Sequence, residues 1–268
     1  RYDVTLYKKE INSIIQEIET RADRFFNSNL YDLCLSYLNC IKSYDRIERY
    51  ADQLYSLNLY ELAIKFLNTI ESRKNADSLF IDKLNKYHLF FLINNAYQEP
   101  TKNKAIASLS LKIKKSSVTI QKYYSDVLVF CQLKTKDTYY SRSIAILDFL
   151  YPDTKLPIEM LSHCYVRCIL GKDFDKNTSL DIEHLVPDSD IKRFYQFVVD
   201  KAQQMISTNP TEALKVCRKI IGNYFDCAET YFKVCKELHD HKQSIPEVEL
   251  LCVIKQLPST QRQLDTCR

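Results

Sequence analysis

The residues in this sequence that are best suited to chemistry are histidines and cysteines, and they gather in two places. His163, Cys164 and Cys168 lie close together, as do Cys235, His239 and His241. The pairs Cys164/Cys168 and Cys235/His239 have the i, i+4 spacing that places two side chains on one face of a helix, where each pair could supply half of a tetrahedral zinc site. No CxxC motif accompanies them, and cysteine on an apolar helix stripe more commonly acts as a small core residue. We therefore expect no metal and no cofactor.

The sequence carries none of the short motifs that are typical of nucleophilic catalysis or of phosphate binding. The sequence contains no GxSxG elbow, no HExxH zinc helix and no glycine-rich phosphate loop. Only two glycines occur in 268 residues, whereas α/β nucleotide-binding folds need glycine for their tight turns. These observations favour a protein that is not an enzyme.

A basic tract is the most suggestive surface feature. Six lysines and no acid occur between Pro100 and Tyr124, and tyrosines follow at its end. Lysines beside aromatic rings could hold phosphates while bases stack on the rings. The same residues could instead form a solvated helix face or a binding site for an acidic peptide. The tract contains no arginine, whose guanidinium binds phosphate through two hydrogen bonds, and this favours the two alternatives over nucleic-acid binding. The residues that could bind a partner here are Lys112, Lys114, Lys115, Lys122, Tyr123 and Tyr124.

Composition bounds the class of protein. The net charge of +4 allows an acidic partner without requiring one, and 46% hydrophobic residues are typical of a folded chain. The ten cysteines are scattered rather than regularly spaced, which predicts free thiols and an intracellular protein, cytoplasmic or nuclear. No apolar run is long enough to span a bilayer, so we expect no membrane partner.

The elements that must position these residues are helices, and two of the segments repeat. Residues 22–41 read ADRFFNSNLYDLCLSYLNCI, and residues 51–70, which begin 29 positions later, read ADQLYSLNLYELAIKFLNTI. Nine of the twenty aligned positions are identical. Self-similarity at a short period is the signature of a helical-repeat array. Apolar spacing predicts helices over residues 4–26, 30–41 and 59–70, with polar corners between them.

Helix, corner, helix with small residues twelve positions apart resembles the tetratricopeptide repeat. That resemblance implies an all-α fold of antiparallel helix pairs stacked in a right-handed α-solenoid. It assigns helix packing to Ala22, Phe25, Tyr31, Cys34 and Leu38 in the first copy, and to Ala51, Leu54, Tyr60, Ala63 and Leu67 in the second. Asparagine (Asn29, Asn58) stands where the family usually has glycine, and the period of 29 is shorter than the family's 34.

Beyond these copies the pattern weakens. We expect helices over residues 118–133, 139–150, 158–170 and 191–207, and a divergent third copy at 202–221 whose second helix begins near Asn209-Pro210. The polar, acidic stretch 171–190, with a short helix near 180–185, is the expected boundary. The predicted organisation is therefore repeats over 1–170, an acidic linker over 171–190, and further helix pairs over 191–268 with a loose tail from about 258.

A stacked array of helix pairs presents an elongated concave surface. We expect a scaffold or adaptor subunit that holds a peptide or helix of a partner protein in that groove. The alternative is a nucleic-acid-binding repeat protein that uses the tract from Lys102 to Lys122. Self-association into a homodimer is a further expectation, because abundant Tyr and Phe suit an apolar end surface.

Overall fold

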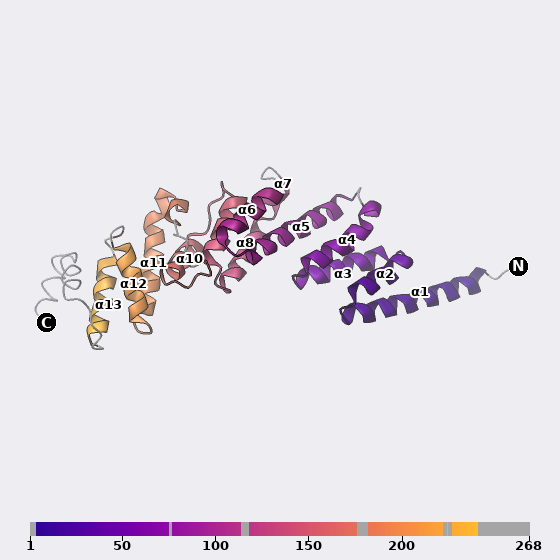
Figure 1. Cartoon of the computed structure of the whole chain (residues 1–268), viewed down its shortest axis with the longest axis horizontal. Coiled ribbons are helices and arrows are strands. Elements are labelled where there is room, and N and C mark those ends of the chain that lie inside the picture. Colours follow the sequence, from indigo (N-terminus) through magenta and orange to yellow (C-terminus); the bar gives the residue numbers. More distant parts are fainter. Residues whose placement is uncertain are drawn as a thin grey trace, which may run out of the picture. The chain divides into compact units, whose positions relative to one another are not determined.

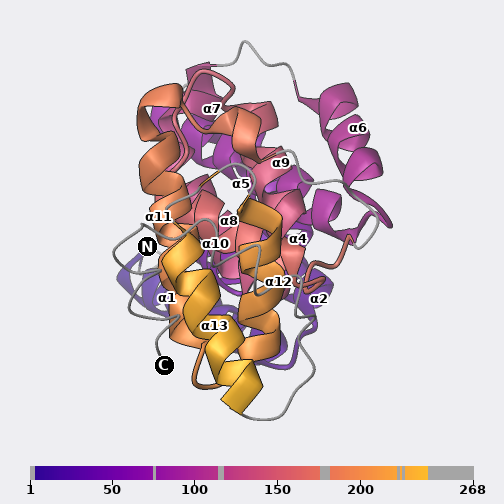
Figure 2. The same ribbon diagram turned by 90° about the vertical axis from the view of Figure 1, so that its left-hand side faces the viewer.

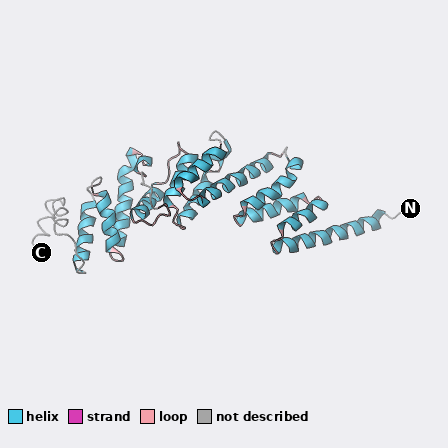
Figure 3. Cartoon of the chain, viewed as in Figure 1, coloured by secondary structure: helices cyan, strands magenta, loops and turns pink. Residues whose placement is uncertain are grey.

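The fold was taken from a computed structural model, which describes residues 4–74, 77–113, 118–175, 182–221, 224 and 227–240. Over these ranges the chain forms thirteen α-helices, two short 3-10 helices and no strand (Figure 3). The prediction of an all-α protein is confirmed. In the same residues, no helix has both the length and the apolar character that crossing a bilayer requires.

The helices follow one another with short connections (Figure 1). In chain order they are α1 (Val4–Asn27), α2 (Tyr31–Cys40), α3 (Tyr44–Ser56), α4 (Tyr60–Lys74), α5 (Ser78–Gln98), α6 (Lys102–Lys112), α7 (Val118–Lys122), α8 (Tyr124–Thr135), α9 (Tyr140–Leu150), α10 (Ile158–Ile169), η1 (Glu183–Leu185), η2 (Asp188–Asp190), α11 (Ile191–Met205), α12 (Pro210–Ile220) and α13 (Ala228–Asp240).

The chain divides into two compact units. Unit 1 comprises Arg1–Asn95 and Ser116–Tyr123, and unit 2 comprises Ala96–Lys115 and Tyr124–Arg268. In unit 1, α1 packs on α2 and α3 packs on α4. In unit 2, α8 packs on α9, and α10 to α13 pack in sequence, each on the next, as Figure 2 shows for α11, α12 and α13.

Left-handed residues close the corners of both repeat copies. Asn29 and Asn58 have φ of 60° and 61°, and each is followed by a leucine whose N–H donates to the carbonyl five residues back. This is the Schellman geometry, in which glycine is the commonest residue and asparagine is tolerated. Lys42 and Thr138 take the same conformation at other corners. The scarcity of glycine is thus compatible with tight helix corners.

The two repeat copies bury equivalent positions in unit 1. Ala22 and Ala51 are fully buried, and so are the pairs Cys34/Ala63 and Leu38/Leu67. Leu54 and Tyr60 are buried as well, whereas Phe25 and Tyr31 are partly buried against the same core. The small residues lie where α1 packs on α2 and where α3 packs on α4. Fully buried small side chains at these positions let the helix backbones approach closely.

The segment predicted as a divergent third copy, residues 202–221, lies in unit 2, and its corner differs from those of the first two copies. Asn209 is not left-handed; its φ is −152°, its side chain accepts the N–H of Glu212, and Pro210 occupies the first turn of α12. The helix therefore begins one residue after the asparagine rather than two, as in the earlier copies. This explains why the small buried residue, Ala213, is displaced by one position. The predicted helix start at Asn209-Pro210 is confirmed.

One predicted helix is interrupted. The sequence pattern indicated a continuous helix over 118–133, but α7 ends at Lys122 and α8 begins at Tyr124. Tyr123 between them is buried, and its hydroxyl donates 3.0 Å to the backbone carbonyl of Asp82 on α5. That tertiary contact overrides the local helical pattern.

Candidate partner-binding surface

Two equivalent hollows lie at the corners of unit 1. The first has a volume of about 260 Å³ and the second of about 250 Å³. Asn29 to Leu33 line the first and Asn58 to Leu62 line the second, so the motif Asn-Leu-Tyr-acid-Leu builds both, 29 residues apart. Leu62 lines both hollows, which makes them neighbours on one surface.

Three of the four leucines that line these hollows are exposed to solvent. Leu30, Leu33 and Leu59 are 48%, 46% and 38% exposed. Phe91 on α5 also lines the second hollow. We define the apolar track as the exposed Leu30, Leu33 and Leu59 together with Leu62 and Phe91, which are partly buried against the core of unit 1. Exposed apolar side chains that gather beside a polar rim are typical of interaction surfaces.

The corner geometry holds the track in place. The hydroxyl of Tyr31 donates to the side-chain oxygen of Asn29 at 2.7 Å, and Tyr60 donates to Asn58 at 2.6 Å. Burial raises the pKa of Tyr60 to about 12, so its hydroxyl keeps its proton at neutral pH. Each bond ties the start of a helix to the left-handed asparagine before it. Leu30 and Leu59 lie between the bonded residues and are exposed to solvent.

Charged side chains join successive helix pairs of unit 1. Asp23 on α1 accepts from Arg46 and Tyr50 on α3, and Asp52 on α3 accepts from Lys83 and Tyr87 on α5. Aromatic stacking repeats beside these bonds: the rings of Phe26 and Tyr50 are 4.0 Å apart, and those of Tyr55 and Tyr87 are 4.1 Å apart. Phe26 and Tyr55 occupy equivalent repeat positions, so the interface between helix pairs is itself repeated.

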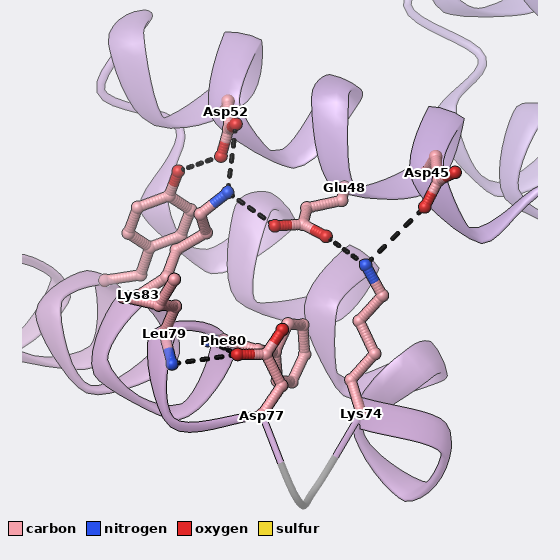
Figure 4. Close-up of polar contacts among 9 residues, drawn as sticks. Asp45, Glu48, Asp52, Lys74, Asp77, Leu79, Phe80 and Lys83 are labelled. Atoms are coloured by element: carbon pink, nitrogen blue, oxygen red, sulfur yellow. Dashed lines mark hydrogen bonds and ion pairs between the residues drawn. The ribbon is translucent and has the colours of Figure 1, made fainter.

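Figure 4 shows the second of these interfaces. Glu48 accepts from Lys74 at 2.5 Å and from Lys83 at 2.6 Å, and Asp45 lies 3.6 Å from Lys74. Burial by itself would raise the pKa of Glu48, but hydrogen bonds from the two lysines outweigh it and the pKa is lowered. Asp77 caps α5 by accepting the backbone N–H groups of Leu79 and Phe80. The charged side chains of this interface thus form ion pairs that join α3 to α4 and α5.

The predicted basic tract is divided between the two units. Lys122 and Tyr123 belong to unit 1, where Lys122 pairs with Asp82, while Lys112 and Tyr124 belong to unit 2. Tyr123 is only 8% exposed and Tyr124 packs edge-on against Tyr151, with ring centroids 4.9 Å apart. Lys114 and Lys115 lie outside the described residues. The Tyr123 ring is therefore too buried for base stacking, and Tyr124 already contacts another aromatic ring.

Unit 2 contains a buried charged cluster that the sequence does not signal. Arg142 is 0% exposed and pairs with Asp175 through Nε at 3.0 Å and Nη2 at 2.7 Å. Its Nη1 donates to the carbonyls of Tyr97 and Glu99 near the end of α5. Asp175 also accepts the N–H of Lys102 at the start of α6, and Tyr139 and Phe174 flank the guanidinium.

Asp173 completes this cluster by accepting both the backbone N–H and the hydroxyl of Ser141 at the start of α9. The two carboxylates thus satisfy two helix N-termini and one arginine. Among the described residues, no buried side-chain nitrogen or oxygen lacks a partner. Part of the stretch predicted as an acidic linker is therefore packed inside unit 2, and its charges join distant helices instead of meeting a ligand.

A smaller hollow of about 170 Å³ lies beside this cluster and is lined by residues that include Lys102, Asp148 and His184. Ser141 also lines it, but the Ser141 hydroxyl is already donated to Asp173. A serine nucleophile needs a base that accepts its proton and returns it to a leaving group. Asp173 accepts both the hydroxyl and the backbone N–H of Ser141, and this is a helix cap rather than the arrangement of a nucleophile and its base.

The cysteine pairs considered for zinc lie in the helical core. Cys164 and Cys235 are fully buried, and burial raises the pKa of Cys164 to about 12. Burial also raises the pKa of Cys168. The His239 side chain and His241 lie outside the described residues. In the part of the chain that is described, no three His, Cys, Asp or Glu side chains converge as metal ligands would, and the eight described cysteines are free thiols.

Comparisons with known proteins identify no relative: no family model, curated protein or solved structure matches this chain. Functional inference therefore rests on the surface itself. The sequence predicts only polar corners between helices at Asn29 and Asn58. The signal it carried for a binding surface was the leucine beside each asparagine, which recurs at a position that helix packing leaves exposed.

Proposed function

We propose that this chain is a non-enzymatic scaffold or adaptor subunit that binds a partner protein through the apolar track of unit 1. The observation that carries the proposal is the repetition of one hollow, at the same motif and of nearly the same volume, in consecutive helix pairs. Side chains that only fill a core have no reason to remain exposed at both copies. A partner segment that lies across the corners would bury leucines that now contact water.

The wider architecture in this proposal is a stack of helix pairs similar to tetratricopeptide-repeat proteins. The repeated Asp–Tyr bonds and stacked rings between successive pairs support it, because they give each pair the same way of docking on the next. In such a stack each helix pair contacts mainly its neighbours, and one face offers the same positions again and again. A stack of this kind would place Leu30 and Leu59 at equivalent positions on the same face.

Affinity purification with matched variants tests the proposal. The bait is the full chain, expressed in cells of its native source, and co-purifying proteins are identified by mass spectrometry. The Leu30→Asp/Leu59→Asp variant places two charges in the track and should lose a partner that the parent chain retains. The control is Leu57→Asp/Leu79→Asp, because these leucines are 61% and 76% exposed and line neither hollow. A partner that both variants retain, or both lose, contradicts the assignment of the track.

A further inference from the structure

The two hollows share a motif but differ in charge. In the first, the Asp32 carboxylate is paired with Lys65 on α4 at 2.6 Å, so the rim is electrically balanced. In the second, Glu61 occupies the position equivalent to Asp32, and its carboxylate forms no ion pair or hydrogen bond with another described residue. The second hollow therefore carries one uncompensated negative charge at its rim.

The walls of the second hollow are suited to a long cationic side chain. Leu59, Leu62 and Phe91 form apolar walls, and the carboxamides of Asn94 and Asn95 join Glu61 among the polar groups. Lysine and arginine bury their methylene stems along apolar surface while the charged head stays at the edge. The head can then meet a carboxylate and amide oxygens, and an aromatic ring nearby favours a cation further.

Building on the proposed function, we propose that the partner is a protein segment that places a lysine or arginine in the second hollow and an apolar side chain in the first. The first hollow, with Leu30, Leu33 and Leu62 as apolar walls and its one carboxylate already paired, offers a neutral site. The second adds the charge that selects a cation. The two hollows together would recognise a segment that carries one apolar and one basic residue at a fixed separation.

The spacing of that pattern follows from the packing of the helices. α2 and α4 contact each other, and Leu62 on α4 lines both hollows. Axes of packed helices are about 8–10 Å apart, and an extended chain covers about 3.3 Å per residue. The apolar and basic residues of the partner should therefore be separated by about three positions in an extended segment.

A nucleic-acid partner does not fit the same surface. The rim of the second hollow is a free carboxylate, which repels phosphates, and the first hollow offers a lysine that is already paired. A charged polynucleotide would thus have to bring negative charge to Glu61. Binding of RNA or DNA at the track is an outcome that would overturn the inference.

Fluorescence polarisation with synthetic peptides tests it directly. The probes are fluorescein-labelled peptides that share one sequence with a fixed leucine and carry arginine, lysine, methionine or glutamate three positions later. The full chain should bind the arginine and lysine peptides about five-fold more tightly than the methionine peptide, which corresponds to about 1 kcal/mol, and the glutamate peptide more weakly still. The preference should shrink as salt is added.

Two variants locate the effect. Glu61→Gln keeps the shape of the second hollow and should reduce the preference for a basic residue to less than about two-fold, since the charge is gone. Asp32→Asn changes the equivalent residue of the first hollow, where Lys65 already balances the charge, and should leave the preference in place. Circular dichroism of both variants should match that of the parent chain. Equal effects of the two variants, no preference among the peptides, or no binding by any peptide would each overturn the inference.

The inference and the proposed function can fail separately. In one outcome, Leu30→Asp/Leu59→Asp abolishes capture of a native partner while Glu61→Gln leaves the capture and its salt dependence unchanged. The track then binds a protein, but the inference that a basic side chain occupies the second hollow is refuted. If neither variant affects capture, both proposals are refuted. Loss of capture with both variants, together with reduced salt dependence for Glu61→Gln, supports both.

Discussion

Tyr87 on α5 donates its phenolic hydrogen to the carboxylate of Asp52 on α3. Tyr50 on α3 makes the same bond to Asp23 on α1, one helix pair earlier. The acceptors Asp23 and Asp52 are 29 residues apart, whereas the donors Tyr50 and Tyr87 are 37 apart, because the helix that follows the second copy departs from the sequence period. The contact between helix pairs therefore recurs even where the spacing of the sequence repeat does not.

Tyr87→Phe tests this docking contact. The variant keeps the ring that stacks on Tyr55 and removes only the hydroxyl, and Asp52 retains Lys83 as a partner. We expect a loss of about 1 kcal/mol in the free energy of unfolding, the usual size for one hydrogen bond. Urea denaturation followed by circular dichroism measures it. Tyr7→Phe, at an exposed tyrosine of α1, is the control and should be neutral. A Tyr87→Phe variant as stable as the parent would show that the hydroxyl contributes nothing.

Thr138→Gly should stabilise unit 2. Thr138 has a φ of 72° in a corner that is closed by Schellman bonds, and a β-branched residue is strained there. Glycine removes a cost of roughly 1–2 kcal/mol for an L-residue in this conformation, offset in part by its greater freedom in the unfolded chain. Thermal unfolding measures the change. Thr135→Gly, within α8, should destabilise instead, and a loss of stability in Thr138→Gly would contradict the strain argument.

Arg142→Met should be among the most damaging substitutions in unit 2. It removes the guanidinium that pairs with the buried Asp175 carboxylate, and it removes the donor to the carbonyls of Tyr97 and Glu99. Breaking one side of a buried ion pair costs about 3–5 kcal/mol. Chemical denaturation of the purified variant tests this value. The double variant Arg142→Met/Asp175→Asn should recover part of the loss, because no charge is then left unpaired; no recovery would point to packing as the cause.

Stability of unit 1 should fall in acid through Glu48. The pKa of Glu48 is lowered in the fold from an ordinary value of 4.5, so its ionised form stabilises the folded state above that pH. This contribution is lost as the pH falls through the lowered value. Glu48→Gln should cost about 1 kcal/mol at pH 7 and progressively less as the pH is lowered below 4.5, measured by urea unfolding at a series of pH values. A cost that does not change with pH would mean that charge is not involved.

Much of the helical fold could be predicted from the sequence because its determinants are local. Apolar spacing located α1, α2 and α4 to within a few residues, and Asn209-Pro210 marked the start of α12. The break at Tyr123 was missed, because nothing near it in the chain disfavours a helix. Its cause is a hydrogen bond to Asp82, 41 residues away.

The buried acids of unit 2 could not be predicted for a similar reason. A stretch with Asp173 and Asp175 has the composition of a solvated linker, and its burial depends on Arg142 and on two helix N-termini that come from elsewhere in the chain. A lone arginine at the start of the apolar helix α9 was the available hint. The apolar track could be predicted only in part. The repeated motif is evident in the sequence, but which of its leucines are exposed depends on how the helices pack.

Photocrosslinking from the track is the most direct test of the central claim that repeated hollows bind a partner protein. A photoreactive phenylalanine analogue replaces Leu33 in one preparation and Leu57 in a second, both as full chains expressed in the native source. Leu33 lines the first hollow, whereas Leu57 is exposed outside both. The account predicts a light-dependent adduct with one defined protein from position 33 and none from position 57. Adducts of equal yield from both positions, or from position 57 alone, would contradict it.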